Sequence, residues 1–129
     1  MPVPRGAEAY RRIEAESRSP VELVLMLYDG ALRFVGEARA AVARNDVKAR
    51  GAATSRAIAI VSELQNTLNV DQGGDVAREL NRLYSYLNGR LLDVSAKRDI
   101  SALDEVHKLL STLREGWSQA SAGTAGDAR

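Results

Sequence analysis

Four stretches of the sequence repeat their apolar residues at intervals of three and four, the spacing that places side chains on one face of an α-helix. They cover residues 20–44, 47–68, 75–97 and 101–119, and short polar segments separate them. No stretch shows a convincing strand-like alternation of apolar and polar residues. Amphipathic helices of this length joined by short turns predict an all-α fold, an antiparallel up-down four-helix bundle.

The two ends of the chain differ from this pattern. Residues 1–9 carry prolines and a glycine without periodic apolar residues, and residues 118–129 are small and polar. Such segments offer too little apolar surface to offset the entropy lost on ordering. We therefore expect a mobile N-terminal cap segment at residues 1–18, a helical bundle at residues 19–119 and a disordered tail at residues 120–129.

Turn and capping residues predict where the helices begin. Ser19 precedes Pro20, and Glu22 follows three residues after the serine, which is the pattern of a capping box with proline at the first helical position. The serine oxygen can accept from a free backbone N–H, and the glutamate can reach back to the cap N–H. The later boundaries are expected at Asn45 or Asp46 (cap of the second helix), Gly73 and Gly74 (turn), and Asp99 or Ser101 (cap of the fourth helix).

The first predicted helix carries more apolar residues than one core-facing row requires. The row assigned to the core consists of Leu23, Leu27, Phe34 and Ala38. The second row consists of Leu25, Tyr28, Leu32 and Val35. Two interpretations remain open: the helix is central and covered on nearly all sides, or the second row forms a groove for a partner.

The third predicted helix has one apolar row and two unusual residues. The row consists of Val76, Leu80, Leu83, Leu87, Leu91 and Val94. Tyr84 lies beside this row, and Gly89 lies in the middle of the helix. Because glycine costs about 1 kcal/mol against alanine within a helix, a close helix approach or a groove floor at Gly89 would explain its presence.

The sequence offers no set of residues for catalysis or for metal binding. It has no cysteine, which excludes disulfides and thiolate ligands, and His107 is its single histidine. Asp104 and His107 have a spacing used in carboxylate-bridged metal pairs, but such a site needs a histidine from each of two helices. We therefore expect no enzyme activity, no metal, no cofactor, and a solvent-facing or interface position for His107.

Charge and hydropathy argue against a nucleic-acid surface and a membrane span. The net charge is +1, and acidic residues are mixed with the modest basic patch of Lys48, Arg50 and Arg56. The longest apolar run, Leu23 to Tyr28, is far shorter than the roughly 20 residues that span a bilayer. The N-terminus lacks the apolar core of a signal peptide. These features predict a cytosolic protein without nucleic-acid or membrane partners.

Three segments of the chain resemble one known family. Residues 19–41, SPVELVLMLYDGALRFVGEARAA, are similar to the signature helix of FliS, the flagellin-specific secretion chaperone family. Residues 72–99, QGGDVARELNRLYSYLNGRLLDVSAKRD, resemble its third helix and following turn. Residues 109–117, LLSTLREGW, resemble its closing helix with a terminal tryptophan, and Tyr10 stands where the family usually has an N-terminal tyrosine.

The resemblance implies a function and two partners. Proteins of this family bind the C-terminal segment of newly made flagellin, which is disordered before assembly. They keep flagellin from polymerising in the cytosol and present it to the gate of the flagellar type III export apparatus. The rival interpretation is a helical adaptor that binds another flagellar regulator or a co-chaperone.

The resemblance and the second apolar row together give a set of expected partner-binding residues. The set consists of Tyr10, Ile13, Leu25, Tyr28, Leu32, Val35 and Tyr84. In the family the N-terminal segment with its tyrosine covers part of the groove when cargo is absent. Here Ala15 stands where the family often has a branched apolar residue, and Ile13 fills the other common apolar place. Tyr10 and Ile13 are expected either to form such a removable cover or to contact the cargo directly.

Overall fold

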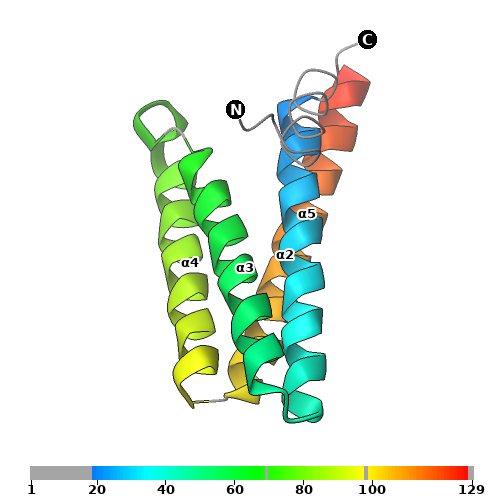
Figure 1. Cartoon of the computed structure of the whole chain (residues 1–129). Coiled ribbons are helices and arrows are strands. Elements are labelled where there is room, and N and C mark those ends of the chain that lie inside the picture. Colours follow the sequence, from blue (N-terminus) through cyan, green and yellow to red (C-terminus); the bar gives the residue numbers. More distant parts are fainter. Residues whose placement is uncertain (1–18, 69, 98, 128–129) are drawn as a thin grey trace, which may run out of the picture.

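The structure, a computed structural model, describes residues 19–68, 70–97 and 99–127. It consists of four helices, α2 (Pro20–Ala43), α3 (Val47–Asn66), α4 (Val70–Lys97) and α5 (Ile100–Asp127) (Figure 1). The described residues contain no β-strand. The predicted all-α four-helix bundle is therefore confirmed.

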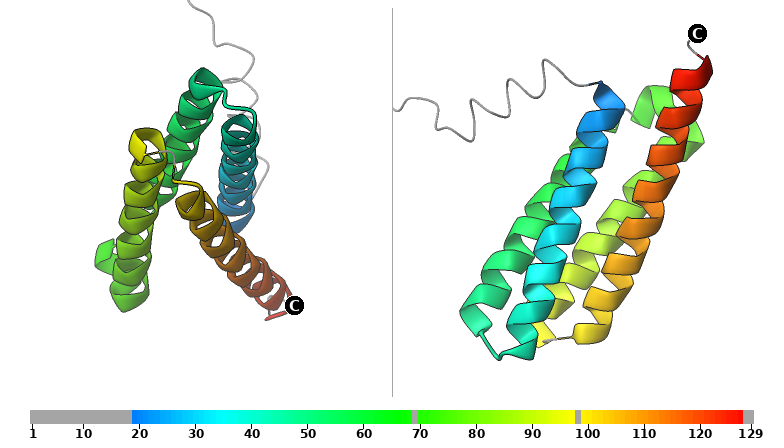
Figure 2. Two further views of the ribbon diagram at one scale, coloured as in Figure 1. Left: turned by 90° about the horizontal axis from the view of Figure 1, so that it is seen from below. Right: turned by 90° about the vertical axis from the view of Figure 1, so that its right-hand side faces the viewer.

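Each helix packs against two neighbours, in the cyclic order α2, α3, α4, α5 (Figure 2). The backbones of α2 and α4 stay apart, as do those of α3 and α5. The interpretation in which α2 is the central helix is therefore wrong. The α2–α3 and α4–α5 turns lie at one end of the bundle, called here the turn end (Figure 1). The start of α2, the α3–α4 connection and the end of α5 lie at the other end, called the open end.

The predicted starts of α2, α3 and α5 are confirmed by the capping bonds. The Glu22 backbone N–H donates to Ser19 Oγ at 3.1 Å, and the Ser19 N–H donates to Glu22 Oε1 at 2.9 Å. Asp46 caps α3 by accepting from the Ala49 N–H at 3.0 Å. Asp99 caps α5 by accepting from the N–H of Ala102 at 3.2 Å. These bonds satisfy backbone donors that have no partner within a helix.

Two helix ends differ from the prediction. The residues before Gly74 form a helical turn of α4, and Gly74 interrupts the helix with a φ of 62°, a left-handed conformation that suits glycine. At the other end of the chain, α5 continues to Asp127 instead of ending near Gln119. The predicted boundary at Gln119 is therefore wrong, because the helix extends into the segment expected to be a tail.

The α2 row that faces the core is not the predicted one. The fully buried residues of α2 are Tyr28, Ala31, Val35, Ala38 and Ala41. Leu27 and Phe34, assigned to the core from sequence, are only partly buried at its edge. This row faces the core because it contains three alanines, whose small side chains let the neighbouring helices approach closely. A Cβ added to Gly30 would lie 3.1 Å from Ile60 Cδ1 of α3.

Two expectations for α4 are also corrected. Val76 was placed in the inner row but is 70% exposed. Gly89 is exposed, and a Cβ added there would meet nothing within 4 Å. Gly89 therefore marks neither a close helix approach nor a groove floor. Leu87, Leu91 and Val94 of this row are fully buried, and Leu80 packs beside the core. Leu83 is only partly buried.

Candidate partner-binding site

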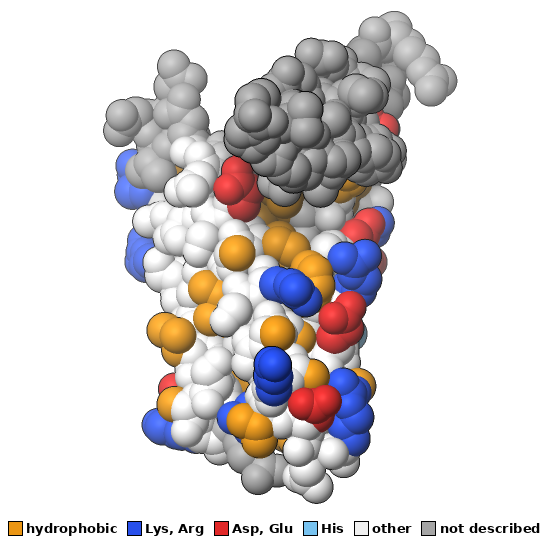
Figure 3. Space-filling model, in the orientation of Figure 1, with side chains coloured by type: hydrophobic (Ala, Val, Ile, Leu, Met, Phe, Trp, Pro, Cys, Tyr) orange, Lys and Arg blue, Asp and Glu red, His pale blue; other side chains and the backbone are white. Residues whose placement is uncertain are grey.

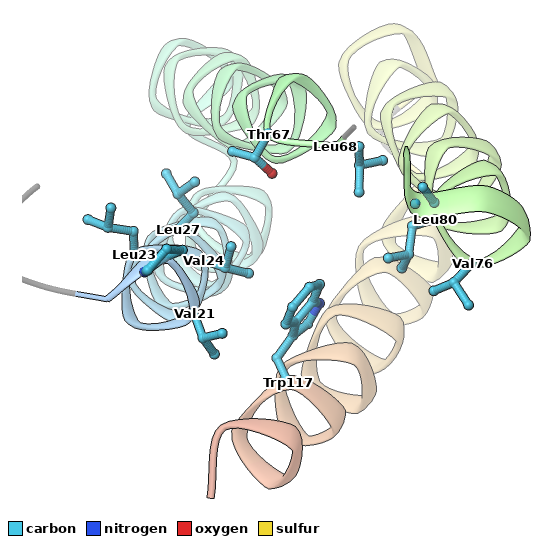
Figure 4. Close-up of a pocket in the computed structure, with 12 residues that line it drawn as sticks. Val21, Leu23, Val24, Leu27, Thr67, Leu68, Val76, Leu80 and Trp117 are labelled. Carbon is cyan, nitrogen blue, oxygen red and sulfur yellow. The ribbon is translucent and has the colours of Figure 1, made fainter. Parts of the chain in front are cut away.

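An apolar pocket of about 440 Å³ opens at the open end of the bundle (Figure 4). All four helices or their ends contribute to it. Its lining consists of Pro20, Val21, Leu23, Val24, Leu27, Thr67, Leu68, Gly73, Val76, Ala77, Leu80 and Trp117. None of these residues is charged, so the pocket can take up apolar groups without desolvating an ion.

Local backbone features give the pocket its walls. The capping box fixes the first turns of α2, from which Val21 and Val24 line one side. Gly73 is part of the opposite wall, and a Cβ there would come within 2.5 Å of Ala77 Cβ. Trp117, the only tryptophan of the chain, projects between these walls from α5 (Figure 4).

A buried pair of tyrosines lies one helical turn below the pocket. Tyr28 follows Val24 by one turn on α2, and Tyr84 follows Leu80 by one turn on α4. Their hydroxyl oxygens are 2.5 Å apart and their ring centroids 6.4 Å apart. This hydrogen bond is a polar link across the diagonal of the bundle. We call these two residues the tyrosine pair.

The tyrosine pair is held in its neutral form. Burial raises the pKa of Tyr28 far above the usual tyrosine range, and the hydroxyl of Tyr84 raises it further. Burial also raises the pKa of Tyr84. The Trp117 side chain lowers the pKa of both tyrosines, because a hydrogen bond from its N–H stabilises the phenolate form. Trp117 is therefore linked electrostatically to the residues beneath the pocket.

The predicted partner-binding residues do not form one surface. Tyr28, Val35 and Tyr84 are buried in the core, so they cannot contact a partner in this conformation. Leu25 and Leu32 are partly buried. The two remaining residues, Tyr10 and Ile13, lie outside the described residues. The idea of a continuous exposed row along α2 is therefore wrong.

Sequence reasoning missed most of the pocket. Val21 and Val24 were not singled out, while Leu23, Leu27 and Leu80 were assigned to the core-facing rows of their helices. The position of the apolar residues along their helices could have indicated the pocket. In an up-down bundle the beginnings of α2 and α4 meet the ends of α3 and α5, so apolar residues at these places share one end.

The described residues offer no centre for catalysis by a metal. They contain no group of three or more His, Asp or Glu side chains that could hold an ion. His107 is exposed on α5. On the face shown in Figure 3, Lys and Arg side chains are mixed with Asp and Glu. No helix in the described part of the chain is long and apolar enough to cross a membrane.

The fold and the pocket place the chain among helical-bundle proteins that offer an apolar binding surface. Residues 4–124 match the family described as flagellar protein FliS, and the chain belongs to this family. It is 39% identical over 121 residues to the flagellar secretion chaperone FliS of Salmonella typhimurium, covering 90% of each chain. It is 32% identical over 117 residues to FliSB of Pseudomonas aeruginosa, covering 88% of this chain and 93% of that one. The resemblance seen in the sequence is therefore confirmed.

Proposed function

We propose that the chain is a cytosolic flagellar secretion chaperone that binds the disordered C-terminal segment of flagellin. By holding this segment it prevents premature polymerisation and delivers flagellin to the flagellar export apparatus. Membership of the FliS family supports the chaperone role. The uncharged pocket at the open end is the observation that carries the binding step, because it offers apolar surface to a chain that has not yet folded.

The energetics of such a complex favour moderate affinity. Burial of apolar surface contributes roughly 25 cal/mol for each Å² removed from water. Ordering a disordered segment subtracts about 2–5 kcal/mol from this gain. A chaperone that releases its cargo benefits from this balance, since very tight binding would slow the transfer to the export gate.

The same pocket is the place where we expect the anchor residues of the cargo. Trp117 has the size and the amphipathic ring of a typical interface anchor. It lies between α2 and α4 at the centre of the pocket (Figure 4). An apolar cargo side chain would contact Trp117 together with Val24 and Leu80.

Calorimetry with full-length and truncated flagellin tests this function. Deleting the C-terminal segment of flagellin should abolish binding, because that segment supplies the apolar groups for the pocket. The matched variants Val24→Asp, in the pocket wall, and Thr112→Asp, on the exposed side of α5, each add one negative charge and so separate the pocket from general surface charge. Only Val24→Asp should weaken binding. Equal affinities for full-length and truncated flagellin would contradict the proposal.

An adaptor for another flagellar regulator or co-chaperone is the second candidate. Among the described residues that line the pocket, only the Thr67 hydroxyl and the Trp117 indole N–H are polar side-chain groups. The chemistry of the pocket therefore selects amphipathic segments in general. Affinity purification of the chain from motile cells distinguishes the two candidates. Recovery of flagellin as the main partner supports the chaperone, and recovery of a regulator without flagellin supports the adaptor.

A further inference from the structure

The two polar side-chain groups on the described wall of the pocket, the Thr67 hydroxyl and the Trp117 indole N–H, decide which hydrogen bonds a ligand could make there. Thr67 Oγ1 donates to the backbone carbonyl of Leu64 at 2.6 Å, so its proton is used at the end of α3. What the pocket wall offers a ligand therefore depends on where the Trp117 N–H is directed.

The Trp117 N–H is directed to the tyrosine pair. Trp117 projects from α5 between the walls of the pocket (Figure 4), and it packs against the core cluster that contains Tyr28 and Tyr84. Its side chain hydrogen-bonds to both hydroxyl oxygens, which lie 2.5 Å apart and so can share one donor. An indole N–H only donates, and a phenol oxygen accepts. The only polar group of Trp117 is therefore already paired inside the bundle.

The surroundings of this hydrogen bond hold the indole ring in place. Tyr28 and Tyr84 are 0% and 1% exposed, so bulk water does not compete for their hydroxyls. On the surface of the bundle, Arg114 donates two bonds to the Asp29 carboxylate, which fixes the part of α5 that carries Trp117 against α2. Because a buried donor without an acceptor is costly, the indole ring has one strongly favoured orientation.

We propose that Tyr28 and Tyr84 are positioning residues that hold the Trp117 N–H inside the bundle, so that the pocket presents the carbon surface of the indole and selects purely apolar anchor side chains. The inference rests on the proposed function, since it concerns the side chains that a cargo segment places in this pocket. A leucine, isoleucine or phenylalanine side chain brings no polar group that needs a partner. A glutamine side chain would lose its bonds to water and find no free side-chain donor on the described wall in return.

Nuclear magnetic resonance tests the position of the N–H directly. Trp117 is the only tryptophan, so its Nε1–H gives a single indole signal in a nitrogen–proton correlation spectrum of isotope-labelled protein. In the unaltered chain this proton should exchange with deuterated water roughly tenfold or more slowly than in free tryptophan, because exchange requires the bond to the tyrosine pair to open. Exchange as fast as in free tryptophan would overturn the proposal.

The variant Tyr28→Phe/Tyr84→Phe removes both acceptors and keeps both rings, so exchange of the indole proton should accelerate roughly tenfold, the effect of one lost hydrogen bond. Thr54→Val is the matched control, because it removes another buried hydroxyl, which donates to the Arg50 carbonyl at 2.7 Å. Equal acceleration in the control would show that exchange follows global stability, and would overturn the positioning role. If the double variant does not fold, each single variant, Tyr28→Phe or Tyr84→Phe, should still exchange faster than Thr54→Val, and exchange no faster than in this control would contradict the proposal.

Two small probes of nearly the same shape, isopropylbenzene and acetophenone, test the selectivity of the pocket. Only acetophenone carries a hydrogen-bond acceptor, and the shift of the indole signal follows the binding of each. The double variant frees the N–H, so its preference for isopropylbenzene should be roughly tenfold smaller than in the unaltered chain and in Thr54→Val. An unchanged preference would overturn the proposed selectivity. Failure of flagellin to bind would contradict the proposed function and leave these results unaffected.

Discussion

Gly89 is an exposed glycine in the interior of α4, and the structure gives it no role in packing. Gly89→Ala should stabilise the protein by about 1 kcal/mol, because alanine restricts the unfolded chain and favours helix. Urea unfolding measures this gain. Gly73→Ala is the matched control and should destabilise, since its Cβ would clash with Ala77. A loss of stability in Gly89→Ala would mean that the residue has a packing role.

The tyrosine pair predicts a loss of stability at alkaline pH. Burial raises the pKa of Tyr28 and Tyr84 in the folded chain above 10.0, the ordinary value that applies after unfolding. The two tyrosines therefore contribute fully to the free energy of unfolding below pH 10. This contribution is lost as the pH rises above 10, because the unfolded chain then releases the tyrosine protons while the folded chain retains them. Urea unfolding at a series of pH values measures this slope.

The variant Tyr28→Phe/Tyr84→Phe is the control for this slope. It should lose most of the alkaline pH dependence, because both buried hydroxyls are gone. Tyr86 remains, and its bond to Glu105 also raises the pKa of Tyr86, so some of the slope should persist. An unchanged slope in the double variant would show that the tyrosine pair does not control alkaline stability.

At the scale of elements, the sequence predicted the helices far better than their orientation. Ser19, Asp46 and Asp99 act locally, so their capping bonds could be read from neighbouring residues. The core face of α2 depends on what packs against it, and α2 has apolar residues on nearly every side. A row of alanines, including Ala31 and Ala38, was the overlooked signal for close packing.

The candidate site was predicted poorly because it depends on distant parts of the chain. Nothing near Tyr28 in sequence reveals that its hydroxyl meets Tyr84 across the bundle. The pocket likewise joins Val24, Leu68 and Trp117, which become neighbours only after three helices have packed. Periodicity identifies the face of a single helix, but it does not show where faces leave a space.

The capping box of α2 predicts a link between helix stability and binding. Ser19→Ala should cost about 1 kcal/mol of unfolding free energy, because the Glu22 N–H loses its partner. It should also weaken cargo binding, since fraying of the first turn displaces Val21 and Val24 from the pocket wall. Asp46→Ala removes a comparable cap at the turn end and should affect stability alone. Equal binding by both variants would contradict this link.

At the scale of the whole molecule, Pro20 and Val21, which line the pocket, are the first residues of α2. The N-terminal segment that carries Tyr10 and Ile13 is therefore joined to the bundle at the pocket. If Tyr10 and Ile13 form a removable cover, cargo must displace it, and the apparent affinity falls by the fraction of time the pocket is covered. Removing residues 1–17 should then tighten cargo binding or speed association, and should raise aggregation of the free protein.

Association rate and affinity of the truncated chain, measured against the full chain, check this prediction. Trp117 fluorescence provides a direct signal, since the only tryptophan lies in the pocket. If Tyr10 and Ile13 instead contact cargo, the truncation weakens binding. A clear loss of affinity would therefore rule out the cover.

The start of α2 and the end of α5 both lie at the open end (Figure 1), which is also the end at which the pocket opens. A peptide joined by a flexible linker to the C-terminal side of α5 would therefore search a small volume that contains its own binding site. Its effective concentration would reach the millimolar range, so a segment whose dissociation constant lies well below that range would occupy the pocket almost completely. A single-chain fusion of this kind could capture short-lived complexes, whereas a bulky tag at either end would compete with the natural cargo.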